Sequence, residues 1–295
     1  MSCPGHARTE TQSAQWISIV DLDRCNGCPG KAVPACVAAC RACHAEDFPN
    51  PVKPIRPYWP QNKMEDFSTK RDDISRLSPY NWLFIQRIEV GDKVLFAPRR
   101  CMHCFDAPCR KLCPFGAIEK TREGAVKIDP QVCFGGAKCR DICPWGIPQR
   151  QAGVGLYLKV APKFAGGGVM FKCDFCSSNL AKGQAPSCAT ACPQKAMLFM
   201  PLAELKAREK ELIGNRYVYG RDENGGTATW YVSSTPFKDI AHALRDSNST
   251  GPGRPHFDTT GRTLQDSPLL NSVLLVPIVA AGAAYALRRK KEKPL

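Results

Sequence analysis

The residues of this sequence with the clearest chemistry are its cysteines, of which there are 17 in a chain of 295 residues. Fifteen of them form four groups, and each group contains two cysteines separated by three residues. The groups are Cys25-x2-Cys28-x7-Cys36-x3-Cys40, Cys101-x2-Cys104-x4-Cys109-x3-Cys113, Cys133-x5-Cys139-x3-Cys143 and Cys173-x2-Cys176-x11-Cys188-x3-Cys192. Cys3 and Cys43 are left over, and we interpret both as ordinary thiols. Cys43 could pair with Cys40 instead, but the choice of Cys36 and Cys40 keeps the four groups alike.

This repeated spacing is typical of ligands for iron–sulfur clusters. In the bacterial ferredoxin run C-x2-C-x2-C-x3-C-P, three cysteines wrap one cluster and the fourth binds its neighbour. Zinc-binding cysteine pairs are usually about 12 to 20 residues apart, whereas the second pair of group two begins five residues after Cys104. Disulfides dominate in small secreted domains, but this chain is long and 43% hydrophobic. Clusters are therefore favoured over zinc and over disulfides.

The third group lacks one cysteine of the ferredoxin run. In CFGGAKCRDICP, residues 133–144, Gly136 stands where the second cysteine belongs. The separation of Cys133 and Cys139 is unchanged, so one ligand has been exchanged and nothing has been deleted. Because the available ligands are the first determinant of cluster type, three thiols suit a [3Fe-4S] cluster. The alternative is a [4Fe-4S] cluster whose open iron takes water or another side chain.

The formal charge of the chain is +14. Such an excess often indicates a nucleic-acid or anionic-membrane partner. Each four-iron cluster with its thiolates carries about −2, so buried clusters would balance much of this charge. No compact run of Lys and Arg with aromatic residues is present, which argues against nucleic acid. The five histidines form no ligand or base constellation, although His103 lies inside a cysteine loop and is a candidate for tuning a cluster by hydrogen bonding.

The segment 268–287, PLLNSVLLVPIVAAGAAYAL, contains no charged residue. A helix of this length spans about 30 Å, the thickness of the hydrocarbon core. We predict a single transmembrane helix in contact with membrane lipid, with a buried core helix as the alternative. The basic tail 288–295 then places the C-terminus in the cytoplasm and the cluster domain on the periplasmic side of the inner membrane. The N-terminal residues show no export signal, so either a signal-bearing partner carries the chain across or this orientation is wrong.

Three stretches carry a resemblance to a known family: RRCMHCFDAPCRKLCPFGAI, KIDPQVCFGGAKCRDICPWGIPQR and KCDFCSSNLAKGQAPSCATACP. Over roughly residues 16–200 the chain resembles the four-cluster electron-transfer (beta) subunits of respiratory molybdoenzymes. Membrane-bound formate dehydrogenase, which the C-terminal segment resembles most, nitrate reductase and quinone-linked hydrogenase belong to this group. The resemblance implies an electron-transfer subunit between a catalytic subunit, of molybdopterin type, and a quinone-reactive membrane subunit. Group one departs from the pattern, because residues 29–35 make its loop five residues longer than x2.

The resemblance also implies a ligand set for each cluster. Groups one and four share one lobe, and groups two and three share the other. Three [4Fe-4S] clusters are assigned to Cys25, Cys28, Cys36 and Cys192, to Cys173, Cys176, Cys188 and Cys40, and to Cys101, Cys104, Cys109 and Cys143. Cys133, Cys139 and Cys113 hold the fourth cluster. Nitrate reductase beta subunits have a non-ligand at the position of Gly136 and a [3Fe-4S] cluster there, and we predict the same here.

The expected fold class is α+β, with two ferredoxin-like cluster-binding lobes, hairpin insertions and the C-terminal transmembrane helix. Turn residues between apolar runs predict hairpins around residues 91–92, 123–124 and 223–226, and the apolar pattern predicts a helix over residues 202–213. In chain order we expect an N-terminal extension (1–15), a four-cluster domain (16–200) with an insertion (44–98) and lobe B (99–150), a helix plus hairpin (201–245), a linker (246–267), the transmembrane helix (268–287) and the cytoplasmic tail (288–295).

Three other functions remain open at this point. The chain could serve a nickel–iron hydrogenase or a cytochrome-linked menaquinone oxidoreductase as the same kind of electron-transfer subunit. It could be a hydratase that binds substrate at an open iron, although no acid–base set adjoins the three-cysteine group. It could be a redox sensor or an assembly scaffold, although the sequence shows no output domain.

Overall fold

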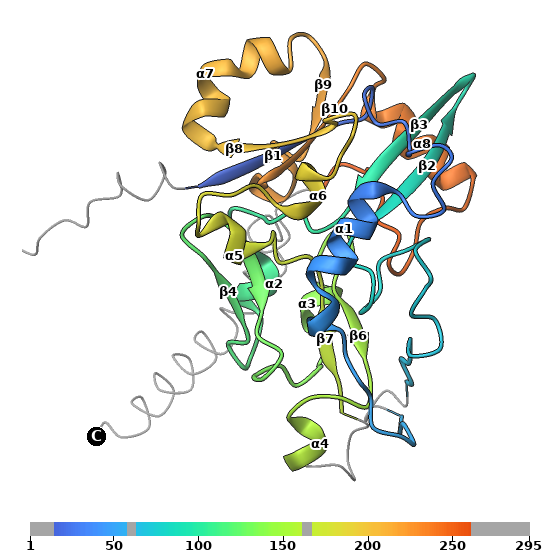
Figure 1. Cartoon of the computed structure of the whole chain (residues 1–295), viewed down its shortest axis with the longest axis vertical. Helices are drawn as coiled ribbons and strands as arrows, with labels where there is room; N and C mark the ends of the chain where they lie inside the picture. Colours follow the sequence, from blue (N-terminus) through green and yellow to red (C-terminus); the bar gives the residue numbers. More distant parts are fainter. Residues whose placement is uncertain (1–14, 58–62, 161–166, 261–295) are drawn as a thin grey trace, which may run out of the picture.

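The computed structural model describes residues 15–57, 63–160 and 167–260 (Figure 1). A four-stranded sheet lies at one end of the molecule and joins the first described strand to strands that come late in the chain. Its order is β8–β1–β10–β9, with β1 at Trp16–Asp21, β8 at Met197–Pro201, β9 at Tyr217–Tyr219 and β10 at Thr229–Ser233. Strand β1 pairs antiparallel with β8 and parallel with β10. Nearly every residue of the two central strands is buried, as expected when both faces of a sheet are covered.

Three smaller sheets have two antiparallel strands each. They pair β2 (Phe84–Val90) with β3 (Lys93–Arg99), β4 (Ile118–Lys120) with β5 (Val126–Ile128), and β6 (Gln149–Gln151) with β7 (Val169–Phe171). Gly91 has a φ of 56°, a conformation that glycine adopts without steric cost at the turn between β2 and β3. The hairpins predicted around residues 91–92 and 123–124 are confirmed, as is the antiparallel pairing of β9 and β10 around residues 223–226.

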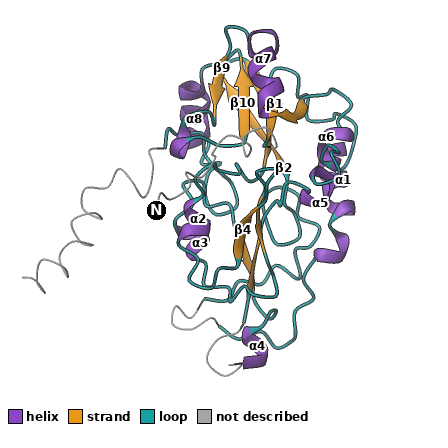
Figure 2. Cartoon of the chain, turned by 90° about the vertical axis from the view of Figure 1, so that its left-hand side faces the viewer, coloured by secondary structure: helices purple, strands orange, loops and turns teal. Residues whose placement is uncertain are grey.

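Short helices carry cysteines of the pairs that are separated by three residues. Helix α1 (Ala35–Cys43) holds Cys36 and Cys40, while α2 (Pro108–Lys111), α3 (Lys138–Asp141) and α6 (Ser187–Thr190) each hold the first cysteine of their pair. Proline is the first residue of α2, where its fixed φ suits a first turn that needs no N–H, and it is the N-cap residue of α1 and α6. Helix α1 packs on α6, and α2 packs on α3. Figure 2 shows α1, α5 (Ser177–Leu180) and α6 on one side of the central strands, and α2 and α3 on the other.

The remaining elements cover the four-stranded sheet and the ends of the molecule. Helix α7 (Leu202–Leu212) packs on β1 and β8 and buries Leu205, which confirms the predicted helix. Helix α8 (Phe237–Asp246) packs on β2 and β9 and buries Ile240 and Leu244. Helix α4 (Tyr157–Val160) and two 3-10 turns, η1 (Ala45–Asp47) and η2 (Glu223–Gly225), complete the described fold.

The described part of the predicted linker, residues 246–267, packs on the body of the protein. Phe257 is only 1% exposed, and its ring lies between 5.0 and 5.3 Å from the rings of Tyr219, Tyr231 and Phe237. The Tyr219 hydroxyl also donates a hydrogen bond to the carbonyl of Asp258 at 2.7 Å. Up to residue 260 this segment is thus anchored to the body by one aromatic side chain, although its composition is otherwise polar.

No helix within the described ranges is long and apolar enough to cross a membrane. The predicted transmembrane segment 268–287 and the basic tail 288–295 lie outside the described residues, and so does nearly all of the N-terminal extension.

Candidate metal centres

The helix pairs bring cysteines of different groups together. Set A consists of Cys25, Cys28, Cys36 and Cys192, which line one small pocket. Burial is the largest cause that raises the pKa of Cys25 to about 11, and the thiols of Cys192 and Cys28 add to it. Set A thus joins three cysteines of group one to the last cysteine of group four.

Set B is the reciprocal arrangement, with Cys40 of group one among Cys173, Cys176 and Cys188 of group four. Burial raises the pKa of Cys40 well above its ordinary value, and the neighbouring thiols of Cys173, Cys188 and Cys176 raise it further. The pKa of Cys176 is raised mainly by burial and next by Cys173 and Cys188. Packing of α1 on α6 therefore produces two thiol sets that exchange one cysteine each.

Set C repeats this crossing between groups two and three, with Cys101, Cys104, Cys109 and Cys143. Burial raises the pKa of Cys143 to about 12, and the thiols of Cys109 and Cys101 contribute to the shift. Burial is also the main cause of the raised pKa of Cys104, followed by Cys143 and Cys101. The last cysteine of group three has thus joined group two, as α2 and α3 pack together.

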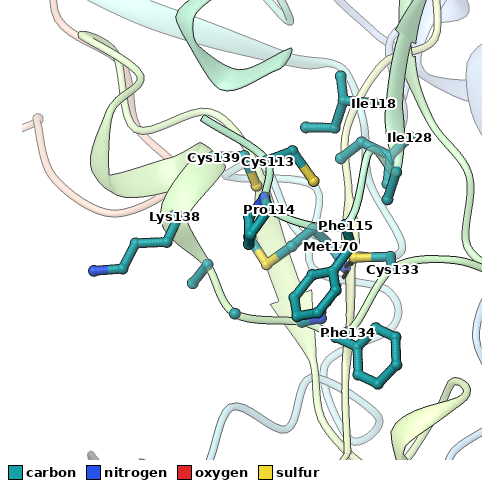
Figure 3. Close-up of a pocket in the computed structure, with 14 residues that line it drawn as sticks. Cys113, Pro114, Phe115, Ile118, Ile128, Cys133, Phe134, Lys138, Cys139 and Met170 are labelled. Carbon is teal, nitrogen blue, oxygen red and sulfur yellow. Dashed lines mark hydrogen bonds between the residues drawn. The ribbon is translucent and has the colours of Figure 1, made fainter. Parts of the chain in front are cut away.

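Set D has three cysteines, Cys113, Cys133 and Cys139, around one pocket (Figure 3). Gly136 lines the same cavity, so the loop that would present a second group-three cysteine passes the site without a thiol. Met170 also lines it, and its backbone N–H lies 3.5 Å from the sulfur of Cys133. The cysteines of each predicted set thus lie near one another, with position 136 beside the incomplete set, and the assignment of each set to a cluster stays a prediction.

The four sets form a row. Among thiols that belong to other sets, Cys188 of set B has the largest effect on the pKa of Cys36 in set A. In the same way, Cys101 of set C has the largest effect on the pKa of Cys173 in set B. Cys139 of set D in turn has Cys109 and Cys143 of set C among its neighbours. The order along the molecule is therefore A, B, C, D.

Hydrogen-bond donors point at several of the sulfur atoms. Backbone N–H groups of Phe175 and Ala196 donate to Cys173 and Cys192 at 3.4 and 3.3 Å. The side-chain amide of Asn224 donates to Cys104 at 3.3 Å. Such donors stabilise negative charge on sulfur, whether it is a thiolate or a cluster ligand.

Buried cations provide a test of whether anionic clusters fit here. The guanidinium of Arg100 is buried beside Cys173 and Cys188, and its Nε and Nη1 have no hydrogen-bond partner within the described part of the chain. A buried, incompletely paired cation costs several kcal/mol unless an anion compensates it. Neutral thiols cannot do so, and the raised pKa values of Cys173 and Cys40 keep these thiols neutral without a metal. An iron–sulfur cluster with its thiolates supplies the missing negative charge, so the site fits the cofactor.

Two histidines lie near the sets in ways that the sequence did not reveal. His44 is buried, with Nε2 3.7 Å from the sulfur of Cys176 and Nδ1 3.0 Å from the carboxylate of Asp47. The only signal for His44 in the sequence is its position directly after Cys43. In the structure Cys43 is exposed, and its sulfur lies within 4.8 Å of the ligand atoms of His44 and Cys176. His103, the predicted tuning residue, instead accepts a hydrogen bond from the backbone N–H of Val126 at 3.0 Å.

Two protein-family models match the part of the chain that holds the cysteine groups. Residues 24–117 and residues 92–201 each match a model of the 4Fe-4S dicluster domain. The chain thus contains two overlapping stretches that resemble domains for pairs of [4Fe-4S] clusters. The matches support several [4Fe-4S] clusters in ferredoxin-like domains of mixed α and β structure.

Several curated proteins are similar to this chain. A protein of Nitratidesulfovibrio vulgaris is 28% identical over 79% of the chain and 62% of its own length. The probable anaerobic dimethyl sulfoxide reductase chain YnfG of Escherichia coli K12 is 38% identical over 38% of the chain and 48% of its own length. The hydrogenase-2 operon protein HybA of E. coli O157:H7 is 25% identical over 92% of the chain and 83% of its own length. This chain thus spans only about half to two thirds of the first two relatives.

Proposed function

We propose that this chain is the electron-transfer subunit of a membrane-bound respiratory oxidoreductase, and that electrons pass along the row of sets A, B, C and D. The observation that carries the proposal is the row itself: each set has thiols of the next as electrostatic neighbours. When bound, a cluster at each set accepts and returns one electron. The chain's own residues hold the sulfur atoms, donate N–H groups to them and exclude water from most of them.

Sets A, B and C each hold a [4Fe-4S] cluster in this proposal, and set D holds a [3Fe-4S] cluster. Four thiols are available in the first three sets, whereas position 136 leaves set D with three. A three-iron cluster usually has a higher potential than a four-iron cluster with the same surroundings. Set D would therefore suit the last position of the relay, where the reduction potential is highest and electrons leave for a quinone.

The surface near set D suits an apolar partner. Leu112, Phe115 and Val132 are between 39% and 47% exposed, and the ring of Phe115 stacks on that of Phe134 at 4.4 Å. We propose that a quinone-reactive membrane subunit covers this surface and that a catalytic subunit of molybdopterin type, as in formate dehydrogenase, delivers electrons at set A. The segment 268–287 would anchor the chain in the inner membrane, with the cluster domain in the periplasm and the C-terminus in the cytoplasm.

A second candidate is the same role in a hydrogenase complex. The relative named as a hydrogenase-2 operon protein matches nearly the whole chain, whereas the relatives named for dimethyl sulfoxide reductase match little more than a third of it. Purification of the full chain from its native membrane with its partners distinguishes the two, because the catalytic partner contains either molybdopterin or nickel.

Iron and sulfide analysis with EPR spectroscopy of the anaerobically purified chain tests the proposal. We expect about 15 irons per chain and a [3Fe-4S] signal in the oxidised protein, in addition to the signals of reduced [4Fe-4S] clusters. A colourless chain that contains zinc or disulfides but no sulfide would refute the whole proposal. About 16 irons without the three-iron signal would refute the assignment of set D alone.

A further inference from the structure

Lys172 is a buried cation in the middle of the row of thiol sets. It lies directly after β7 and is 6% exposed. Its ammonium group donates hydrogen bonds to the carbonyl of Val126 and, at 3.0 Å, to the carbonyl of Cys173. These carbonyls belong to different parts of the fold, β5 and the group-four loop, so they fix the ammonium group between them.

The thiols around Lys172 come from two different sets. Cys101 and Cys109 belong to set C, and Cys173 belongs to set B. The ammonium group is buried near these three cysteines and donates a hydrogen bond to the carbonyl of Cys173. Cys101 and Cys173 are also neighbours of each other, so Lys172 lies where sets B and C approach.

Two other cations near the sets differ from Lys172 in this respect. Arg100 has its thiol neighbours, Cys173 and Cys188, in set B. Lys120 is half-buried, donates to the carbonyl of Phe105 at 2.7 Å and has Cys104 of set C as its thiol neighbour. Arg100 therefore lies near set B, Lys120 lies near set C, and Lys172 lies near both sets.

We propose that Lys172 is a shared cation that raises the reduction potentials of the clusters at sets B and C and balances the electron while it passes between them. This inference rests on the proposed function. Reduction adds one negative charge to a cluster, and a nearby buried positive charge stabilises the reduced form because the surrounding dielectric is low. A cation that faces both clusters stabilises the electron on either side, so it keeps the two potentials close while the electron moves.

The test compares Lys172→Met with Lys120→Met in the full, cluster-loaded chain. Both changes remove one positive charge and shorten the unbranched side chain by one atom. The potentials are measured by redox titration with EPR detection, and Cys104→Ser and Cys176→Ser identify the signals of sets C and B. We expect Lys172→Met to make reduction of both clusters at least tenfold less favourable, which is about 59 mV for a one-electron couple. Lys120→Met should lower the potential at set C and leave set B unchanged.

Several outcomes would overturn the inference. It fails if Lys172→Met loads iron fully but shifts only one potential, or neither. If that variant does not load iron, Lys172→Arg decides: full loading with both potentials retained supports a role for the charge, whereas failure to load shows that the lysine serves packing alone. A wild-type chain without reducible clusters would instead refute the proposed function, so the two failures are distinguishable.

Discussion

Glu65 holds the loop of set D in place from the insertion. Its carboxylate accepts one ion pair from Arg140 and one from Arg150, both at 2.9 Å. Arg140 lies on α3 directly after Cys139, and Arg150 also donates to the carbonyl of Gly135 at 3.3 Å. These contacts connect residues 63–65 to both ends of the group-three loop. Substitution of Glu65 should therefore loosen the cluster at set D before the others.

The size of the effect of Glu65→Gln follows from the burial of the three partners. Arg150 has a side chain only 2% exposed, and those of Glu65 and Arg140 are 18% and 21% exposed, so solvent screens both pairs weakly. A hydrogen bond to a charged group contributes about 1.5–3 kcal/mol. Glutamine retains one acceptor oxygen but no charge. We expect local opening of the loop to become easier by about 2 kcal/mol, which makes the open form about 30-fold more populated.

The assay is the rate at which a ferrous chelator removes iron from set D, followed by loss of the [3Fe-4S] EPR signal without air. If opening limits the loss, Glu65→Gln should lose this signal about 30-fold faster than the wild type. Glu119→Gln is the matched control, because Glu119 pairs with Lys127 at 2.8 Å on the surface, where both side chains are more than a third exposed. A rate for Glu65→Gln within about twofold of the rate for Glu119→Gln would refute this reasoning.

The pH dependence of the same assay provides an independent check. Burial opposes ionisation of Glu65, but its hydrogen bonds and ion pairs with Arg140 and Arg150 outweigh that effect and lower its pKa. A depressed carboxyl pKa stabilises the fold fully above the unfolded value of about 4.3, and the stabilisation is lost as the pH falls through the folded value. The ratio of variant to wild-type rates should therefore stay constant from about pH 8 to pH 5 and decrease only in stronger acid.

Three further substitutions test individual contacts. Gly136→Cys should supply the missing ligand, add one iron and abolish the three-iron EPR signal; unchanged iron content would contradict the assignment. Asn224→Gly, which suits the φ of 53° at that position, removes the hydrogen bond to Cys104 and should lower the potential at set C, with set A unchanged in the same redox titration. Gly135→Ala would place a Cβ 2.6 Å from the carbonyl oxygen of Gly168 at a φ of 68°, so iron analysis should show a loss confined to set D.

The sequence predicted what depends on local spacing. The hairpin around Gly91 and the helix from Leu202 follow from turn residues and apolar periodicity over a few residues. The four cysteine groups are equally local, because each loop and short helix presents its own thiols. Assignment of each thiol to a set came from a family resemblance, since local spacing does not determine which helix packs on which.

The contacts around the thiols could not be predicted in the same way. Asn224 reaches Cys104 from 120 residues away along the chain, and His44 reaches Cys176 from 132 residues away. Such pairs depend on the packing of distant elements, and neither residue type is unusual in its own segment. Arg100 and Lys172 did leave a local signal, because each directly precedes the first cysteine of its group. A cation at that position enters the core with the cysteine that follows it.

This arrangement links part of the chain's excess of positive charge to its cofactors. Arg99 is also buried, with Nε and Nη1 unpaired among the described residues, but its guanidinium lies over the ring of Phe257 at 3.7 Å and no thiol is among its electrostatic neighbours. Arg100 and Lys172 are different, because both lie near the thiol of Cys173, whose pKa is raised by burial so that it stays neutral until a metal binds. Burial of these two cations is therefore costly in the cluster-free chain and favourable in the loaded one. It follows that packing of the segments around sets B and C and insertion of their clusters must stabilise each other.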